Sequence, residues 1–143
     1  MRVYIASSWR NQHAVEMLTA ELRKKGCEVI SFVDNNNGEQ AGHLAIENGI
    51  PVDFDEWIFS TKGTISFEYD LLGATTSDLF IYIGPSGIDA WAEVGAAFAC
   101  GIPIYGLWAK GEQAGLMQRM VMWFSDYREL LGECYLLKRN RGL

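Results

Sequence analysis

The chain has 143 residues and a mass of 16.0 kDa, which is the size of one domain and excludes a pair of catalytic domains. Apolar residues make up 49% of it and charged residues 21%, so we expect a globular protein and not a disordered one. Eighteen acidic and twelve basic side chains give a formal charge of −6, the wrong sign for neutralising nucleic-acid phosphates. We therefore expect no nucleic-acid partner.

Nothing in the chain suits a membrane or export. The longest uncharged run, residues 94–109, has sixteen residues and is interrupted by glycine and proline. A membrane-spanning helix needs about twenty mostly apolar residues. The apolar stretch in residues 1–6 is too short for a signal peptide. We expect a cytoplasmic protein that does not associate with membranes.

The cysteines and histidines do not form a recognisable metal or nucleophile motif. Cys27, Cys100 and Cys134 are far apart and lack a C-x-x-C pairing, so we interpret them as small buried hydrophobic residues. His13 and His43 do not stand in a motif that pairs them with serine and aspartate. We expect neither a bound metal nor a cofactor.

The N-terminal third predicts a strand, a helix and a second strand. Residues 2–6 are an apolar run, and residues 11–25 carry apolar side chains at helical spacing. Gly26 ends this helix, and residues 27–33 are rich in β-branched and aromatic side chains. A β-α-β unit of this kind is typical of a parallel sheet.

Residues 34–63 break this alternation with asparagines, glycines and a proline. An irregular insertion of this length in a small domain usually has a function, such as a lid over a site. The alternation then resumes to the end of the chain, with the predicted elements being helix 64–75, strand 79–83, helix 89–100, strand 102–108, helix 112–120, strand 121–124 and helix 127–137.

These elements predict one α/β domain over residues 1–143. Its sheet is doubly wound, with about five parallel strands and helices on both faces, which makes a three-layer sandwich. Ligands of such folds bind at the carboxyl ends of the strands, near the point where the strand order reverses.

The loop after the first strand lacks the G-x-G-x-x-G pattern of dinucleotide-binding proteins. It offers instead the Ser8 hydroxyl, the Arg10 guanidinium and the N–H groups of the next helix, which suit one phosphate or carboxylate. The alternative is that Ser8 caps the helix and Arg10 is solvated.

The loop after the third predicted strand, residues 84–87, contains glycine, proline and serine and opens a helix that Ser86 or Asp89 would cap. Glu93 lies about one turn inside that helix, where the partial positive charge of the helix start favours an ionised carboxylate. We expect Glu93 to be charged and able to act as a nucleophile or to stabilise a cation. The alternative is that it only complements the helix dipole.

Asp70, at the end of the helix that precedes the third strand, is placed to reach the same edge of the sheet. Two carboxylates from different elements are what cleavage of a glycosidic bond needs, since one meets the anomeric carbon and the other handles the proton of the leaving group. The alternative for Asp70 is an ordinary surface acid.

Three segments, in order and at compatible spacings, resemble the nucleoside 2-deoxyribosyltransferase superfamily, which includes the 2'-deoxynucleoside 5'-phosphate N-hydrolases. They are Tyr4-Ile5-Ala6-Ser7-Ser8, Asp70-Leu71-Leu72-Gly73, and residues 87–97 with Glu93, Gly95 and Ala97, ahead of Gly101-Ile102-Pro103. The resemblance covers residues 1–6 and about 66–107, and it implies a flavodoxin-like fold. The insertion after the second strand matches poorly.

The resemblance also implies a retaining mechanism. Glu93 matches the nucleophile that attacks C1' of a deoxyribosyl group, Asp70 matches the acid that assists departure of the base, and Tyr4 matches the tyrosine that orients the nucleophile. Water or a second nucleobase would then resolve the glycosyl-enzyme intermediate.

Substrate-binding positions follow from the same resemblance. Ser8, Arg10 and Ser86 fall where the N-hydrolase branch binds a 5'-phosphate. Gly87 stands where the transferase branch has an acidic residue, with Asp89 offset by two positions. The indole rings of three tryptophans are candidates to stack on the base or to lie in the core: Trp9, Trp57 and Trp91.

The leading hypothesis is therefore an enzyme that cleaves or transfers the N-glycosidic bond of a nucleoside or nucleoside 5'-monophosphate. A non-catalytic nucleotide-binding or sensing module and an interaction scaffold with an aromatic surface are the alternatives. We also expect a homo-oligomer. Residues 34–93 carry eleven acids and one base, a charge of −10, whereas the rest of the chain has seven acids and eleven bases, or +4. An acidic middle suits a cationic, oxocarbenium-like transition state.

Overall fold

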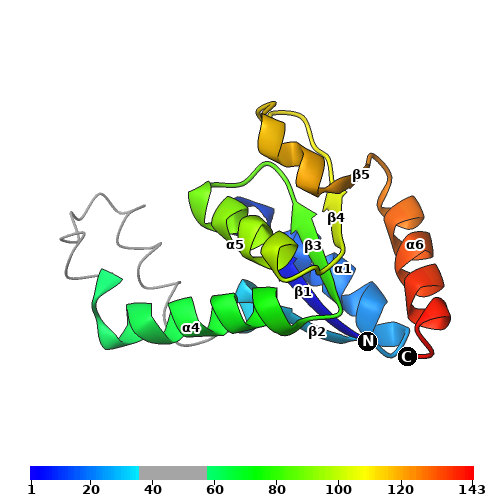
Figure 1. Cartoon of the computed structure of the whole chain (residues 1–143), viewed down its shortest axis with the longest axis horizontal. Helices are drawn as coiled ribbons and strands as arrows, with labels where there is room; N and C mark the ends of the chain where they lie inside the picture. The colour runs from blue at the N-terminus through cyan, green and yellow to red at the C-terminus, as the bar shows by residue number, and fades with distance from the viewer. Residues whose placement is uncertain (36–57) are drawn as a thin grey trace.

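The computed structural model describes residues 1–35 and 58–143, and its centre is a five-stranded, all-parallel sheet (Figure 1). The strand order is β2-β1-β3-β4-β5, so the order reverses beside β1. This is a flavodoxin-like arrangement. The strands are β1 (Arg2–Ala6), β2 (Glu28–Ser31), β3 (Leu79–Ile83), β4 (Ile104–Leu107) and β5 (Met122–Phe124).

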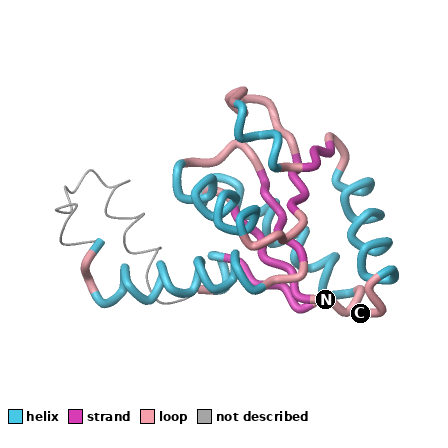
Figure 2. The backbone as a smooth tube through the Cα atoms, viewed as in Figure 1, coloured by secondary structure: helices cyan, strands magenta, loops and turns pink. Residues whose placement is uncertain are grey.

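Helices cover both faces of the sheet (Figure 2). One face packs against α4 (Thr61–Thr76) and α5 (Ile88–Ala99), through side chains that include Ala74 and Val94. The other face packs against α1 (Gln12–Lys24) and α6 (Tyr127–Asn140). The sheet and its helices therefore form the three layers that the sequence predicts.

Strand register decides which side chains meet on each face. Tyr4 pairs with Phe80, and Ala6 pairs with Tyr82. Because successive side chains of a strand point to opposite faces, these four residues lie together on the α4/α5 face. Their odd-numbered neighbours, such as Ile5, belong to the core on the α1/α6 face.

The fold class is confirmed, with differences at the ends of elements. The predicted helix 112–120 is a loop followed by a short 3-10 helix, η3 (Leu116–Met120), since two glycines and few apolar residues at helical spacing precede it. Helix α4 begins at Thr61, inside the predicted insertion, because the Ser60 side chain caps it by accepting from the Gly63 N–H. Most of that insertion, residues 36–57, lies outside the described residues.

Two smaller expectations have opposite outcomes. Asp126 caps α6 as predicted, because its carboxylate accepts from the Arg128 N–H. Cys27 and Cys134 are buried as expected, whereas Cys100 is exposed. Cys100 ends α5 at the surface, so its side chain does not reach the core. In residues 1–35 and 58–143, no helix has the length and apolar character to cross a bilayer.

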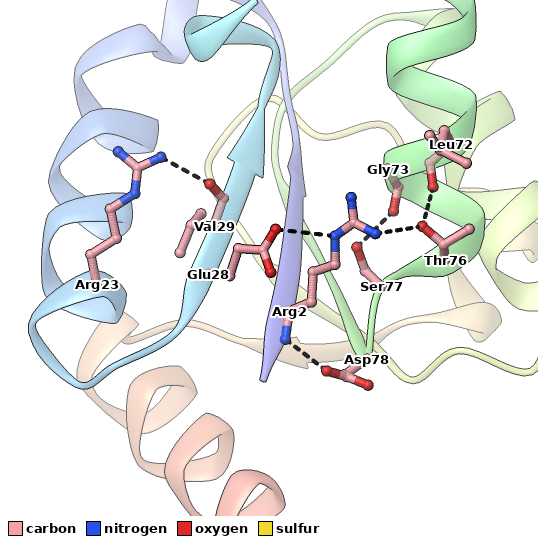
Figure 3. A network of polar contacts seen from close by, with 9 residues as sticks. All are labelled: Arg2, Arg23, Glu28, Val29, Leu72, Gly73, Thr76, Ser77 and Asp78. Carbon is pink, nitrogen blue, oxygen red and sulfur yellow. Dashed lines mark hydrogen bonds and ion pairs between the residues drawn. The ribbon is translucent and has the colours of Figure 1, made fainter. Parts of the chain in front are cut away.

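At the amino edge of the sheet, polar side chains are paired in a network that ties β1 to its neighbours (Figure 3). The Arg2 main-chain N–H donates to Asp78 Oδ2 at 2.7 Å, and the Arg2 guanidinium donates to Thr76 Oγ1 at 3.1 Å. The same guanidinium lies 3.5 Å from a Glu28 carboxylate oxygen. Each of the two carboxylates at this edge therefore faces a group of Arg2.

Candidate active site

Tyr4, Asp70 and Glu93, which are far apart in the sequence, meet on the α4/α5 face of the sheet. The Tyr4 hydroxyl oxygen lies 3.1 Å from Asp70 Oδ1 and 3.2 Å from Glu93 Oε2, within hydrogen-bond distance of both. Tyr4 is 1% exposed and Asp70 is 7% exposed, while Glu93 is partly buried. The alternative that Asp70 is a surface acid is therefore wrong.

The local sequence explains how the three side chains are held. Tyr4 is on a central strand and packs against Phe80 with ring centroids 5.4 Å apart. Gly73, one turn after Asp70 on α4, lies directly against the Tyr4 ring, since a Cβ at Gly73 would come within 2.4 Å of Tyr4 Cδ2. The glycine of the Asp70-Leu71-Leu72-Gly73 segment thus allows α4 to approach β1 closely enough for Asp70 to reach the Tyr4 hydroxyl.

The two carboxyl groups share one phenol. A phenol has a single hydrogen and can donate it to one carboxylate at a time. The second short oxygen–oxygen contact at Tyr4 is a hydrogen bond only when the other carboxyl group is protonated and donates to the Tyr4 oxygen. The geometry therefore fits a cluster that holds one carboxyl proton between Asp70 and Glu93.

The electrostatics of Glu93 agree with that protonation state. Burial raises the pKa of Glu93 from 4.5 to about 8, the negative charge of Asp70 adds to the rise, the Tyr4 hydrogen bond opposes it, and Asp89 adds a smaller rise. The expectation that the helix start keeps Glu93 ionised is therefore wrong, because desolvation and Asp70 outweigh the helix dipole. Burial and the two carboxylates also raise the pKa of Tyr4 well above its usual value, so Tyr4 stays a neutral phenol.

The two carboxyl groups are close enough to interact. Because Asp70 Oδ1 and Glu93 Oε2 contact the same hydroxyl, at 3.1 and 3.2 Å, the ionisation of one acid affects that of the other across the Tyr4 oxygen.

The residues predicted in the first loop lie apart from this cluster. Ser8 accepts from the Arg10 N–H at 3.4 Å and caps the short 3-10 helix η1 (Trp9–Asn11), which precedes α1. Arg10 is exposed. Among the residues that the structure describes, no hydrogen bond or ion pair joins Ser8 or Arg10 to Tyr4 or its carboxylates.

The second predicted loop opens α5, but its cap differs from the prediction. The N-cap residue is Gly87, which has no capping side chain, so neither Ser86 nor Asp89 caps this helix. Asp89 lies in the first turn of α5, and its charge contributes to the raised pKa of Glu93. Ser86 is partly buried in the loop between β3 and α5.

The three tryptophans considered for base stacking differ in position. Trp9 packs edge-on against Phe32 in the core of the α1/α6 face, with centroids 4.9 Å apart, on the opposite face of the sheet from Tyr4. Trp91 packs on the α4/α5 face, 4.9 Å from Tyr82 and 6.4 Å from Trp123. Trp57 lies outside the described residues. Of the described pair, Trp91 is on the face that carries Glu93.

A second pairing of a tyrosine with a carboxylate lies on the same face and was not predicted. The Tyr82 hydroxyl donates to Glu112 Oε2 at 2.8 Å. Tyr82 sits in an apolar strand that gives no sign of a polar role, and Glu112 falls in a segment that the sequence predicts as helical. Side chains two residues apart in a strand share a face, so Tyr82 lies on the same face as Phe80, the strand partner of Tyr4. That alternation was the one signal in the sequence that could have placed Tyr82 beside Tyr4.

A cavity of about 470 Å³ lies at the carboxyl edge of the sheet, but on the α1/α6 face. Its lining includes Asn11, Trp108 and Tyr127, and its one acid, Asp126, is paired with Arg128 at 2.6 Å. None of the three clustered residues lines it. We assign the candidate site to the Tyr4 cluster, since the cavity has no pair of carboxylates that could act together.

The chain resembles known proteins in structure. It superposes on the 2-deoxyribosyltransferase of Bacillus psychrosaccharolyticus with a TM-score of 0.59 and 23% identity, over 91% of this chain and 90% of the other. It superposes on the CMP N-glycosidase of Clostridium botulinum with a TM-score of 0.55 and 19% identity, over 94% and 98%. A conserved protein of Enterococcus faecalis V583 gives a TM-score of 0.57 and 14% identity, over 98% of both chains.

The fold is shared with nucleoside deoxyribosyltransferases and nucleotide N-glycosidases. No protein-family model and no curated protein sequence matches the chain. The resemblance inferred from the sequence is confirmed as structural similarity at low identity, and these neighbours act on N-glycosidic bonds.

Proposed function

We propose that the protein cleaves or transfers the N-glycosidic bond of a nucleoside or nucleoside 5'-monophosphate, through a glycosyl-enzyme intermediate on Glu93. The observation that carries the proposal is the contact of one buried tyrosine hydroxyl with both Asp70 and Glu93. The similarity in fold to a deoxyribosyltransferase and a CMP N-glycosidase supports it.

In this mechanism, the Glu93 carboxylate attacks C1' of the sugar as the bond to the base breaks, and a glycosyl ester forms. Asp70, in its protonated form, donates its proton to the departing base. The raised pKa of Glu93 favours its protonated form in the free protein, so this proton must pass to Asp70 before attack. Water or a second base then attacks C1' and releases Glu93.

Tyr4 has two roles in the proposal. Its hydroxyl lies between the two carboxyl groups, so it fixes the Glu93 oxygen for attack. The same contact provides a route for the proton to exchange between Glu93 and Asp70. The rigid packing of Tyr4 on Phe80 supports both roles, because positioning must be precise to lower a barrier.

The test is release of free base, followed by chromatography, from a panel of deoxynucleosides, ribonucleosides and their 5'-monophosphates. Each substrate is supplied with and without a second base as acceptor, which separates hydrolysis from transfer. The Glu93→Gln protein is assayed in parallel, with Glu28→Gln at the opposite edge of the sheet as the matched control. No base release from any substrate, or equal release by the Glu93→Gln protein, would overturn the proposal.

A non-catalytic nucleotide-binding module is the second candidate, and the exposed Arg10 beside Ser8 favours it. It requires ligand binding that depends on phosphate and on Arg10, with no turnover. Calorimetric titration of the Arg10→Ala and Glu93→Gln proteins with a nucleoside monophosphate distinguishes the two candidates, since the module loses affinity only in the first variant.

A further inference from the structure

The pairing of Tyr82 with Glu112 places a third carboxylate on the α4/α5 face, which carries the candidate active site. Tyr82 is completely buried in β3, and its hydroxyl donates to Glu112 Oε2 at 2.8 Å. Burial, followed by the Glu112 hydrogen bond and charge, raises the pKa of Tyr82, so the phenol remains a donor at neutral pH. Glu112 is thus held by a rigid partner, although it comes from the loop after β4.

Strand register locates this pair relative to the Tyr4 cluster. Tyr82 pairs with Ala6, so it lies one strand over from Tyr4 and two residues closer to the carboxyl edge, on the same face. Strand spacing and rise put the two tyrosine Cα atoms about 8 Å apart. Tyr82, and the Glu112 carboxylate bonded to it, therefore lie on the β4 side of the cluster and closer to the carboxyl edge of the sheet.

The Glu112 side chain also contacts the loop that follows β3. A Cβ at Gly84 would lie 2.1 Å from Glu112 Oε2, so the carboxylate rests directly on the Gly84 backbone. In parallel α/β folds, the loop between a central strand and its helix is where an anion commonly binds, on main-chain N–H groups and the positive end of the helix. In this chain, the Glu112 carboxylate lies against Gly84, the first residue of that loop.

The loop after β1 has its polar side chains committed to the protein as well. Ser7 donates to the Ile83 carbonyl at 2.6 Å, and the Asn11 amide donates to Ser7 Oγ and to the Pro85 carbonyl, each at 2.9 Å. Ser8 accepts from a main-chain N–H within its own turn. These bonds tie the β1 and β3 loops together, and the charged side chain that remains there is the exposed Arg10.

We propose that Glu112 determines substrate choice, by accepting a hydrogen bond from the 5'-hydroxyl of a nucleoside and repelling a 5'-phosphate. The inference rests on the proposed glycosidic function and narrows its substrate class to nucleosides. A carboxylate and a phosphate dianion in one small site repel strongly, whereas a carboxylate and a hydroxyl form a charge-assisted hydrogen bond. One exposed arginine, screened by solvent, does not offset that repulsion.

The test compares each deoxynucleoside with its 5'-monophosphate in the wild-type, Glu112→Gln and Tyr82→Phe proteins. Glu112→Gln removes the charge and keeps the shape, and Tyr82→Phe keeps the ring packing and releases the carboxylate. Glu28→Gln makes the same change in net charge at the opposite edge. Base release gives kcat and KM, and calorimetric titration of the Glu93→Gln protein gives affinities for both ligands without turnover.

We expect the wild-type protein to favour the nucleoside by at least about tenfold in kcat/KM and in affinity. Glu112→Gln should narrow that preference by about fivefold or more, through a lower KM for the monophosphate, and Glu28→Gln should leave it unchanged. A preference for the monophosphate, or an unchanged ratio in an active Glu112→Gln protein, overturns this inference and leaves the proposed function standing. Release of base from neither ligand overturns the function itself, and failure of both ligands to bind overturns both.

Discussion

At the amino edge of the sheet, the carboxylates of Glu28 and Asp78 each face a group of Arg2, whereas at the carboxyl edge Asp70 and Glu93 face each other across one tyrosine. In the first arrangement, each carboxylate meets a cation or a main-chain N–H. The second brings two acids together in a buried site, and the pKa of Glu93 rises to about 8, first through burial and then through Asp70.

The difference indicates which edge is built for structure and which for chemistry. Both edges use side chains that are distant in sequence, so both are consequences of the fold. The carboxyl edge holds two acids close together in a buried site, and strongly shifted pKa values of that kind concentrate at functional sites. Variants that exchange or remove charges at the two edges should therefore affect different properties.

The largest expected effect is on catalysis at the carboxyl edge. Glu93→Gln removes the proposed nucleophile and should reduce base release by at least about 10³-fold, because the carboxylate left in the cluster, Asp70, is required as the acid. Glu28→Gln at the amino edge should leave the rate within about twofold of wild type. Chromatographic assays under matched conditions measure both. A similar loss in the two variants would show that the edges do not differ in the way described.

The next effect concerns Tyr4. Tyr4→Phe keeps the packing on Phe80 and removes the hydroxyl, so we expect kcat to fall by about 10–100-fold while the fold is retained. Circular dichroism verifies the fold, and steady-state kinetics gives kcat. Full activity in a folded Tyr4→Phe protein would contradict the positioning role.

The pH dependence of the reaction distinguishes Asp70 from Tyr4, because these two residues shift the pKa of Glu93 in opposite directions. Because the cluster must keep one proton for Asp70 to donate, kcat/KM should fall as pH rises through an apparent pKa near 8 that belongs to the cluster. Tyr4 lowers the Glu93 pKa, so Tyr4→Phe should move this falling limb to higher pH. Asp70→Asn removes the acid, and with a substrate that carries a good leaving group it needs only ionised Glu93, so its kcat/KM should rise with pH through a pKa below 8, since Asp70 no longer raises it. A falling limb near pH 8 in the Asp70→Asn protein, or a rising limb in the wild type, would refute the assignment.

A smaller effect is expected on stability. Glu93 has a higher pKa in the folded protein than its ordinary 4.5, so the folded state binds the extra proton between pH 4.5 and about 8. The free energy of unfolding should therefore fall as pH rises through that window. Glu93→Gln removes this dependence and should gain about 2 kcal/mol relative to wild type between pH 5 and pH 9, after allowance for solvent near the partly exposed group. Denaturant titrations at pH 5 and pH 9 give the free energy of unfolding of both proteins. If the difference between the two proteins is the same at both pH values, the prediction is wrong.

The smallest effect belongs to the amino edge. Asp78→Ala removes the acceptor of the Arg2 N–H and should lower the free energy of unfolding by about 1 kcal/mol, without moving the pH–rate profile. Chemical denaturation and the base-release assay test the two halves of this prediction. A displaced profile in the Asp78→Ala protein would mean that the two edges are coupled.

The sequence predicts the fold well because its strands are short apolar runs that alternate with amphipathic helices. The bounds of β1 and β3 agree with the prediction, since each run is set off by polar or small residues. The prediction of a helix over residues 112–120 was wrong. The segment's polar and small residues are compatible with a helix, but they give it no apolar face to bury. Such a segment depends on tertiary contacts, here the bond from Tyr82 to Glu112.

The candidate site was predicted in part. The proximity of Tyr4, Asp70 and Glu93 follows from the strand order and from the glycine at position 73, and a family resemblance was enough to suggest it. The protonation of Glu93 was not predictable, because it depends on burial and on Asp70 more than on the helix start that the sequence reveals. In the first loop, the hydroxyl groups of Ser7 and Ser8 bond within the protein, and binding of a phosphate there by Ser8 and Arg10 stays a prediction.

The proposed mechanism depends above all on the covalent role of Glu93. The protein is mixed with a deoxynucleoside that releases base, the reaction is stopped with acid in the first turnovers, and the peptides are analysed by mass spectrometry. We expect the mass of one deoxyribosyl group on the peptide that contains Glu93 in the wild-type protein, and its absence in Glu93→Gln. Rapid base release with an unmodified Glu93 peptide, or with the sugar on another residue, would contradict the proposed mechanism.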